Sequence, residues 1–331
     1  MKKKYDVYGI GNALVDLEFK VTPEFLKKHD VKKGVMTLVD EETQFNLIDD
    51  IDEDKMTPKS GGSAANTVIA VSQLGGKAFY SCKVARDTFG DFYLSDMKEA
   101  DINTNFDRQE REDGITGKCL VMITEDADRT MNTFLGITSA LSTGEVDDQA
   151  IKNAEYVYIE GYLVASDTGF EAMKLTKKVA EESNVKTALT LSDPSIVEGF
   201  KRRFQKVIAP SVDLLFCNED EAREFTGKDE LMEAANALKK AANRFVITQG
   251  SNGAIIYDGD SFIDIAPHHV EAVDTNGAGD IFAGAFLYGI TNGLDYAAAG
   301  DLASLAGSKI VSQYGPRLNQ HEMQDLLKEL A

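Results

Sequence analysis

The strongest chemical signal in this 331-residue sequence is a glycine-rich turn that leads into an apolar helix, residues 272–286. Gly277 and Gly279 carry no side chains, so the backbone amides of the turn can approach a ligand closely. The positive end of the helix adds to this attraction, which predicts an anion pocket that needs no lysine. Asp280 stands in the first helical turn, beside that pocket. Because a carboxylate is unfavourable next to a bound phosphate, we interpret Asp280 as a general base for an attacking hydroxyl; the alternative is a helix-capping acid.

Two common nucleotide-binding motifs do not fit this turn. A dinucleotide-binding GxGxxG motif would need a third glycine where Phe282 stands, and no early βαβ unit contains the turn. The P-loop pattern GxxxxGK[ST] is absent from the sequence. If the chain binds a nucleotide phosphate, it must therefore do so with a different device.

Two other segments could bind the hydroxyl groups of a sugar. Residues 60–67 place paired glycines at the start of a helix, with Asn66 one turn in. Residues 11–16 leave the first strand at its carboxyl end, where ligands of open α/β sheets lie. There, Asn12 and Asp16 could hold a vicinal diol, because hydrogen bonds to a carboxylate are strong. Each segment, taken alone, could also be an ordinary turn.

Two further strand ends carry residues suited to a nucleotide and its metal ion. Asn218 and Glu221 follow a strand and lie one helical turn apart, and oxygen ligands of this kind suit Mg²⁺ held through waters. The loop at residues 248–253 follows another strand and offers bare backbone to a nucleotide. Either segment could also be a plain helix start or a hairpin turn. The four histidines lack the spacing of a base, a nucleophile or a metal site, so we interpret them as structural or surface residues.

These segments lie between alternating strands and helices. Strands separated by helices of this length predict an α/β fold with a doubly wound, mainly parallel sheet that is covered on both faces. The predicted strands are residues 5–10, 79–84, 156–159, 187–191, 214–217 and 245–248. The predicted helices are residues 63–74, 91–100, 171–182, 219–225 and 230–242.

Two stretches interrupt this alternation. Residues 14–39 and 117–137 have the alternating pattern of antiparallel strands and few helical spacings. They could meet as a small sheet over the edge of the main one, or they could be two unrelated hairpins. The acidic run at residues 49–54 indicates a solvated turn rather than a calcium loop, because the glycine and the terminal glutamate of such a loop are missing.

The composition narrows the classes of partner. The chain has 35 Lys and Arg against 55 Asp and Glu, a formal net charge of −20, which disfavours nucleic acid or an anionic membrane. Three widely spaced cysteines without a CxxC pair argue against a disulfide scaffold or a zinc module and indicate a reducing compartment. Neither a signal-peptide pattern nor a membrane-length apolar run is present. We therefore expect a cytoplasmic protein that is a monomer or a homodimer.

Together, these loops resemble the ribokinase-like family of carbohydrate and purine kinases, most closely its adenosine kinase branch. The early segment at residues 60–66 and the late segment at residues 274–280 carry the resemblance, which covers nearly the whole chain. The likeness to the adenosine kinase branch comes from residues 11–16, 25–28, 189–194 and 214–219. Two features depart from that branch: Ala64-Ala65 replaces a more polar pair, and the loop at residues 248–253 looks more like that of sugar kinases.

The resemblance implies a Rossmann-like core with a small β-sheet lid. The core would comprise residues 1–11, 49–104 and 138–331, and the lid residues 12–48 and 105–137. The implied reaction transfers the γ-phosphoryl group of MgATP to the ribose 5′-hydroxyl of a nucleoside, adenosine giving AMP. Alternatives are a kinase for fructose, ribose or a related sugar, an inosine or guanosine kinase, and a non-catalytic nucleotide-binding module. A monovalent cation such as K⁺ could be a further cofactor.

The same resemblance implies a role for each candidate residue. Asp280 would be the base, and the amides of Gly277, Ala278 and Gly279 would form the anion hole. Arg129 would reach the phosphates when the lid closes. The ribose would be held by Asn12, Asp16, Gly62 and Asn66; Mg²⁺ and its waters by Asn218 and Glu221; and ATP by Thr248, Gly250 and Gly253. Leu14, Leu38 and Phe134 would form an apolar clamp on the nucleobase or, alternatively, belong to the core of the lid.

Overall fold

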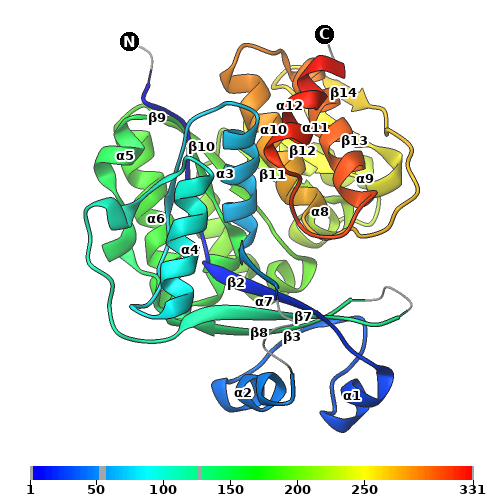
Figure 1. Ribbon diagram of the computed structural model, residues 1–331. Helices are drawn as coiled ribbons and strands as arrows, with labels where there is room; N and C mark the ends of the chain where they lie inside the picture. The colour runs from blue at the N-terminus through cyan, green and yellow to red at the C-terminus, as the bar shows by residue number, and fades with distance from the viewer. Residues whose placement is uncertain (1–2, 52–56, 126–128, 330–331) are drawn as a thin grey trace.

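The computed structural model describes residues 3–51, 57–125 and 129–329, which form two β-sheets and their covering helices (Figure 1). In these ranges the larger sheet has nine strands in the order β14-β13-β12-β11-β10-β9-β1-β5-β6. Strand pairs from β12 to β6 are parallel, and β13 and β14 add an antiparallel edge. The strands are β1 (Tyr5–Ile10), β5 (Ala78–Ser81), β6 (Asn103–Thr104), β9 (Ala154–Ile159), β10 (Lys186–Thr190), β11 (Leu214–Asn218), β12 (Phe245–Thr248), β13 (Ala254–Tyr257) and β14 (Phe262–Ile265).

Helices cover both faces of this sheet, as predicted. One face carries α3 (Ser63–Gln73), α4 (Thr88–Glu99), α10 (Ala278–Thr291), α11 (Tyr296–Val311) and α12 (Gln320–Glu329). The other carries α5 (Asp148–Lys152), α6 (Asp167–Glu182), α7 (Pro194–Ile208), α8 (Glu219–Thr226) and α9 (Leu231–Leu238). No helix in the described ranges has both the length and the apolar character needed to cross a membrane.

The strands of the larger sheet are apolar on both sides because both sides are packed. In β1, Val7 belongs to the core under α3 and α10, whereas its neighbour Tyr8 belongs to the core under α5 and α6. Both side chains are fully buried. This two-sided packing explains why β1 reads as a continuous buried strand in the sequence rather than as an alternating one.

The second sheet, which we call the small sheet, lies across the end of the larger, main sheet where β1 ends and α3 begins (Figure 1). Its strands run in the order β3-β8-β7-β2-β4. The two irregular stretches therefore meet in one sheet, and the alternative of unrelated hairpins is wrong. The strands are β2 (Leu14–Lys20), β3 (Met36–Leu38), β4 (Thr57–Gly61), β7 (Thr116–Ile123) and β8 (Arg129–Gly136), with helices α1 (Pro23–Lys28) and α2 (Glu41–Asp49) at its outer side.

The directions of these strands differ in part from the prediction. Strands β7 and β8 form an antiparallel hairpin, and β2 pairs with β4 in the same way, but the pairs β2–β7 and β3–β8 are parallel. Strand β4 also falls inside residues 49–104, which the sequence places in the core, yet it pairs with β2 of the small sheet. Of the acidic run, Asp49 ends α2, while residues 52–54 lie outside the described part of the chain.

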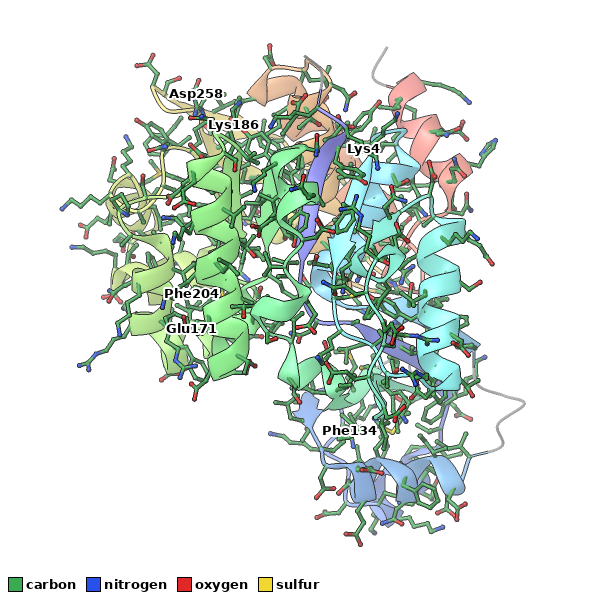
Figure 2. All side chains as sticks on the ribbon, turned by 90° about the vertical axis from the view of Figure 1, so that its left-hand side faces the viewer. Lys4, Phe134, Glu171, Lys186, Phe204 and Asp258 are labelled. Atoms are coloured by element: carbon green, nitrogen blue, oxygen red, sulfur yellow. The ribbon has the colours of Figure 1, made fainter. Side chains whose placement is uncertain are left out.

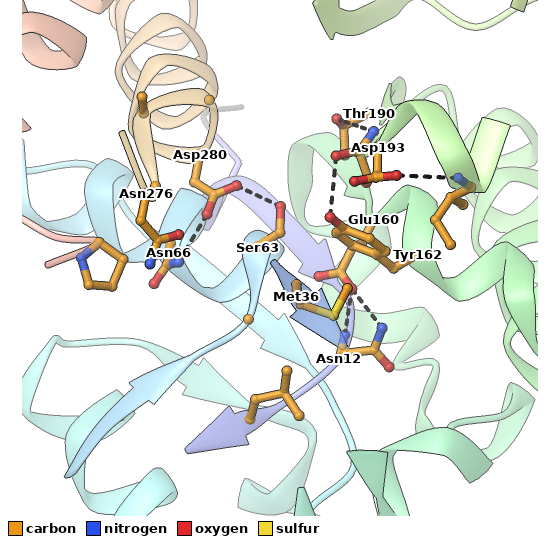
Figure 3. Close-up of a pocket in the computed structure, with 18 of the residues that line it drawn as sticks. Asn12, Met36, Ser63, Asn66, Glu160, Tyr162, Thr190, Asp193, Asn276 and Asp280 are labelled. Carbon is orange, nitrogen blue, oxygen red and sulfur yellow. Dashed lines mark hydrogen bonds between the residues drawn. The ribbon is translucent and has the colours of Figure 1, made fainter. Parts of the chain in front are cut away.

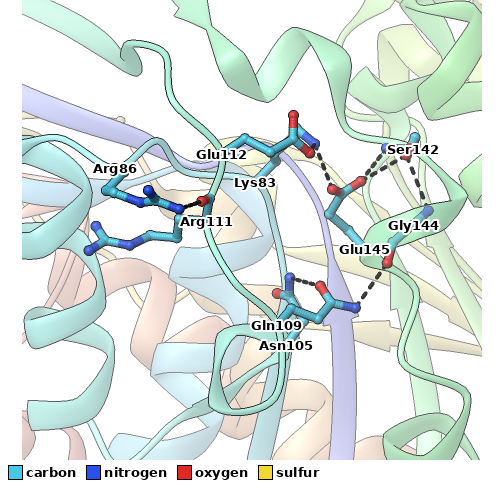
Figure 4. A network of polar contacts seen from close by, with 9 residues as sticks. All are labelled: Lys83, Arg86, Asn105, Gln109, Arg111, Glu112, Ser142, Gly144 and Glu145. Atoms are coloured by element: carbon cyan, nitrogen blue, oxygen red, sulfur yellow. Dashed lines mark hydrogen bonds and ion pairs between the residues drawn. The ribbon is translucent and has the colours of Figure 1, made fainter.

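A polar network fastens the two chain segments that connect the main sheet to β7 and β8 (Figure 4). Lys83 follows β5, and its Nζ atom donates to Glu112 (2.6 Å) ahead of β7 and to Glu145 (2.8 Å) beyond β8. Glu145 is 8 % exposed and also accepts a hydrogen bond from the backbone of Ser142. Lys83 thus holds the segment before β7 and the segment after β8 against the main sheet.

Candidate active site

A cavity of about 520 Å³ lies between the carboxyl ends of the main strands and one face of the small sheet (Figure 3). Its volume falls within the range of small-molecule sites. Its lining brings together segments that are far apart in the sequence. Of the predicted residues, it includes Asn12, Leu14, Asp16, Leu38, Gly62, Asn66, Asn218, Glu221, Thr248, Gly277, Ala278, Gly279 and Asp280.

Asp280 points toward the cavity from the first turn of α10, and its carboxylate is held by two side chains of α3 (Figure 3). Ser63 Oγ donates to Oδ1 at 2.6 Å, and Asn66 Nδ2 donates to Oδ2 at 2.9 Å. Burial raises the pKa of Asp280 to about 6, and the two hydrogen bonds oppose that rise because they favour the charged form. The group is therefore mainly ionised at neutral pH, with a pKa closer to neutrality than that of an exposed aspartate.

The glycine turn presents backbone amides to the same cavity. Gly277 caps α10 with φ +75°, a left-handed conformation that favours glycine, and a Cβ atom there would overlap the carbonyl group of Pro316. A Cβ atom on Gly279 would instead meet only open space. Among the described residues, no side chain caps the amino end of α10. The Ala278 amide already donates to the Thr275 carbonyl at 3.3 Å. The amino end of α10 and its helix dipole nevertheless make this turn suited to an anion.

Glu160, which directly follows β9, fixes the amino end of α3. Glu160 is 1 % exposed and accepts hydrogen bonds from the Ala64 amide (2.9 Å) and from the side-chain Nδ2 (2.8 Å) and main-chain N (3.1 Å) of Asn12. Burial raises its pKa to about 7. A Cβ atom on Gly11 would overlap the Glu160 carboxylate, so Gly11 makes room for this contact. Asn12 is thus held rigidly at the cavity wall.

Asp16 lies on β2, where its carboxyl group packs against the backbone of Gly61. It is 9 % exposed, and burial raises its pKa to about 7, while the nearby Arg317 acts in the opposite direction. Gly62 follows Gly61 in the chain, has a φ of +105° and packs against the carbonyl group of Asn12. Asp16, Asn12 and Gly62 therefore converge on one side of the cavity, where donors and acceptors for hydroxyl groups are available.

Asn218 and Glu221 form a capping box at the start of α8. The Asn218 side chain accepts from the Glu221 amide at 2.8 Å, and Glu221 accepts from Asn218 Nδ2 at 2.7 Å. Burial raises the pKa of Glu221 to about 7. The described residues contain no group of three potential ligands that could hold a metal by themselves. This donor set fits an ion such as Mg²⁺ only if phosphate oxygens and waters supply most of its coordination.

A second cavity of about 330 Å³ lies on the other side of the glycine turn. Gly250 and Gly253 line it, and both have positive φ angles, 55° and 87°. Thr248, Ala278 and Gly279 line this cavity and the first one alike. The glycine turn therefore stands at the boundary between two neighbouring spaces.

The small sheet contributes an apolar wall. Leu14 and Leu38 line the first cavity, and Met36 and Leu38 remain 46 % and 60 % exposed. Further apolar lining residues that the sequence did not single out are Val121, Met131 and Leu135. This wall offers a flat ligand a hydrophobic surface.

Phe134 is not among the described residues that line either cavity, although its neighbours Thr133 and Leu135 line the first. Side chains of a strand alternate between the two faces of a sheet, so one position along β8 decides which side is reached. Phe134 lies in the part of the molecule that carries the small sheet and its outer helices (Figure 2). In this structure Phe134 is half-buried on β8 and belongs to neither described hydrophobic core, so its place in a clamp or in the core of the lid stays a prediction.

Arg129 does not line either cavity within the described part of the chain. Its guanidinium group lies 3.1 Å from Asp274 of the glycine turn and 3.5 Å from Glu18 of β2, and stacks over Tyr314. Asp128, which precedes it, is outside the described residues. In this structure, Arg129 therefore joins the small sheet to the base of the glycine turn, and any contact with phosphate would require it to move.

Sequence reasoning missed Ser63 and Glu160. Ser63 was visible as part of the segment at residues 60–67, next to Gly62, but its contact with Asp280 joins positions 217 residues apart. Glu160 stands directly after the predicted strand at residues 156–159. In the same way, Asn218 directly follows the predicted strand at residues 214–217, and Asn12 stands two residues after the one at residues 5–10. The rule that ligand-binding groups follow the carboxyl ends of parallel strands could have found it.

Comparison with known proteins agrees with this architecture. A solved structure described as a probable sugar kinase protein from Rhizobium etli is 31 % identical, with a TM-score of 0.89 over 99 % of this chain and 100 % of that one. The structure of adenosine kinase from Sinorhizobium meliloti gives 30 % identity and the same TM-score and coverage. Among curated proteins, adenosine kinase of Saccharomyces cerevisiae is 28 % identical, covering 93 % of this chain and 95 % of its own.

These likenesses confirm the predicted fold, a doubly wound α/β core with an additional small β-sheet. They also identify the chain as a phosphotransferase that acts on hydroxyl acceptors. The family model of the pfkB family carbohydrate kinases matches residues 35–323, most of the sequence. The chain therefore belongs to the pfkB family of carbohydrate kinases.

Proposed function

We propose that this protein transfers the γ-phosphoryl group of MgATP to the ribose 5′-hydroxyl of adenosine, giving AMP. The observation that carries the proposal is the position of the apolar wall. It faces the same cavity as Asp280 and the glycine turn, while Asn12, Asp16 and Gly62 supply polar groups between them. A nucleoside has a flat apolar base and a polar ribose, and this division matches that of the cavity. The adenosine kinases among the similar proteins support the assignment.

The mechanism follows from how Asp280 and the glycine turn are arranged. Asp280, ionised at neutral pH, accepts the proton of the acceptor hydroxyl as that oxygen attacks the γ-phosphorus atom of ATP. The bond from this phosphorus to the β-phosphate oxygen breaks, and ADP leaves. The amides of Gly277, Ala278 and Gly279 stabilise the negative charge on the transferred group. Because the turn separates the two cavities, an acceptor in the first and ATP along Thr248, Gly250 and Gly253 in the second would meet across it. Holding both in line supplies much of the rate enhancement.

The metal ion belongs to the nucleotide in this proposal. Mg²⁺, when bound with ATP, neutralises charge on the phosphates. Asn218 and Glu221 would orient waters around it, since each is already engaged by the other in the capping box. This arrangement keeps a carboxylate near the phosphates without requiring it to bind the metal directly.

The proposal is tested by a coupled kinase assay on a panel of acceptors. We expect ADP formation with adenosine, a 5′-phosphate product by chromatography, and no turnover of 5′-deoxyadenosine, which lacks the reacting hydroxyl. The panel includes inosine, guanosine, ribose and fructose, and the Asp280→Asn variant serves as the inactive control. Faster turnover of a free sugar than of every nucleoside would contradict the assignment of the apolar wall to a nucleobase.

A further inference from the structure

Arg317 makes a set of contacts behind Asp280, the proposed base. It lies between α11 and α12, and its side chain is 15 % exposed. Its Nε donates to Asn66 Oδ1 at 2.9 Å, one Nη to Asp96 at 3.2 Å, and the other Nη to Ser60 Oγ at 2.9 Å. The three partners lie 221 to 257 residues away in the sequence, and one of them, Asn66, lines the cavity.

The contact with Asn66 decides which way its amide points. A guanidinium group has only donors, so the atom of Asn66 that faces Arg317 must be the carbonyl oxygen. The NH₂ group of the same amide must then face Asp280, and it donates to Asp280 Oδ2 at 2.9 Å. If the amide were reversed, its oxygen would face the carboxylate, which would favour the protonated form of Asp280.

We propose that Arg317 is a positioning residue for phosphoryl transfer, which fixes the amide of Asn66 so that it donates to Asp280 and keeps this carboxylate ionised and aimed at the acceptor. Arg317 touches neither cavity among the described residues, so it acts through Asn66 rather than on a substrate. The catalytic part of this inference depends on the proposed function. The effect on the ionisation of Asp280 does not.

The charges around Asp280 support this role. Arg317 is the cation that lowers the pKa of Asp280, and it also lowers that of Asp16. The acidic groups that face Asp280 from other elements are Asp16 on β2 and Glu160 after β9, together with the hydroxyls of Tyr158 and Tyr162. Each of these is affected by the charge of Asp280. Arg317 thus opposes the rise in the pKa of Asp280 that burial causes.

The same short segment also supports the glycine turn. The amide of Gly315 donates to Asp274 Oδ2 at 2.9 Å, and Pro316 packs against Gly277. A substitution of Arg317 could therefore disturb the turn simply by loosening the segment. Gln73 provides a matched control, because its Nε2 donates to the carbonyl of Leu318 at 2.9 Å and holds the same segment without contacting Asn66 or Asp280.

The first experiment measures the ionisation of Asp280 directly, by ¹³C NMR titration of protein labelled in its aspartate carboxyl groups. The signal is assigned by its loss in Asp280→Asn. We expect Arg317→Gln to move the titration midpoint of Asp280 upward by about one pH unit, as for loss of a nearby opposite charge and of a fixed donor. Arg317→Lys, which keeps the charge and one donor, should move it less, and Gln73→Ala should leave it in place.

The second experiment follows kcat against pH with adenosine and MgATP saturating. A higher midpoint of the base should shift the acid limb of the profile to higher pH in Arg317→Gln, partly in Arg317→Lys, and not in Gln73→Ala. An unchanged Asp280 titration in Arg317→Gln, or an equal shift in Gln73→Ala, would overturn the inference. If Arg317→Gln fails to fold by thermal melting, an Arg317→Lys titration identical to wild type overturns it instead. If wild-type protein phosphorylates no acceptor, the proposed function fails while the NMR result still decides the role of Arg317.

Discussion

The two walls of the cavity differ in how firmly their side chains are held before any ligand binds. On the wall formed by the main sheet and its helices, Asp280, Glu160 and Asn12 are each fixed by at least two hydrogen bonds. On the wall formed by the small sheet, Met36 and Leu38 are 46 % and 60 % exposed on a strand of three residues. The chemical groups are thus arranged in advance, whereas the recognition surface depends on a ligand to cover it.

This difference has an energetic meaning. Prearranged donors need not reorganise when charge develops, so they lower the barrier of the chemical step. Exposed apolar side chains gain roughly 25 cal/mol for each Å² that a ligand removes from water, so they contribute to binding. Substitutions on the main-sheet wall should therefore affect kcat, and substitutions on the small-sheet wall should affect KM.

The largest effect is expected for Asp280→Asn. The amide keeps the size of the side chain but cannot accept the proton, so we expect kcat to fall by about 10² or more. Binding of adenosine, measured by calorimetry, should change little, because the small-sheet wall is intact. A variant with near-normal kcat would remove Asp280 from the role of base.

Two glycine substitutions separate the anion pocket from its support. A methyl group on Gly279 points into open space at the cavity, so Gly279→Ala should fold normally but reduce kcat by about tenfold through obstruction of the phosphate. The methyl group of an alanine at position 277 would overlap Pro316, and the backbone φ of +75° there is unfavourable for alanine. Gly277→Ala should therefore lower the free energy of unfolding by about 1–3 kcal/mol. Thermal melting and kcat measured on both variants test this contrast. Equal melting temperatures for the two would contradict it.

A smaller effect is expected on the small-sheet wall. Leu38→Ser removes apolar surface from the cavity, so the KM for adenosine should rise by about fivefold while kcat stays within about twofold. Phe45→Ser is the matched control, because Phe45 is 65 % exposed on α2 and lines neither cavity in the described structure. Steady-state kinetics with varied adenosine measures both. A fall in kcat without a change in KM would place Leu38 on the chemical side of the comparison.

The smallest effect is the response of the wild-type enzyme to mild acid. The base must be ionised, and the pKa of Asp280 is raised to about 6, so activity is lost as the pH falls through that value. We expect kcat at pH 5.5 to be about fourfold lower than at pH 7, from the fraction of ionised carboxylate. The loss should reverse when the pH is restored. A rate that stays constant down to pH 5 would show that ionisation of Asp280 does not limit turnover.

Features encoded within a short stretch of sequence were predictable. The turn around Gly277 and the helix that carries Asp280 follow each other directly in the chain, and Asn218 and Glu221 of the capping box are only three positions apart. The alternation of strands and helices was equally clear, because a parallel sheet needs a crossover between its strands. These local signals gave the α/β fold and thirteen of the residues that line the cavity.

Features that depend on how distant segments meet were not predictable. Alternation of side chains in β2 and β7 shows that they are strands but not that they run parallel, since the pattern is the same in either direction. The choice between Phe134 and Leu135 depends on strand register, in which one step reverses the face. Asn66 contacts two residues that are distant in the sequence: Arg317, 251 residues away, and Asp280, 214 residues away. No local sequence pattern marks such contacts.

The short connections between the two sheets have a consequence for movement. Only three residues, Gly11 to Ala13, separate β1 from β2, and Gly62 alone separates β4 from α3. Rotation of the small sheet would change the backbone at these two connections, and Asn12 stands in one of them while its side chain donates to Glu160. Under the proposed function, the same few residues would both connect the two sheets and hold the acceptor, so a bound acceptor would restrict rotation of the small sheet.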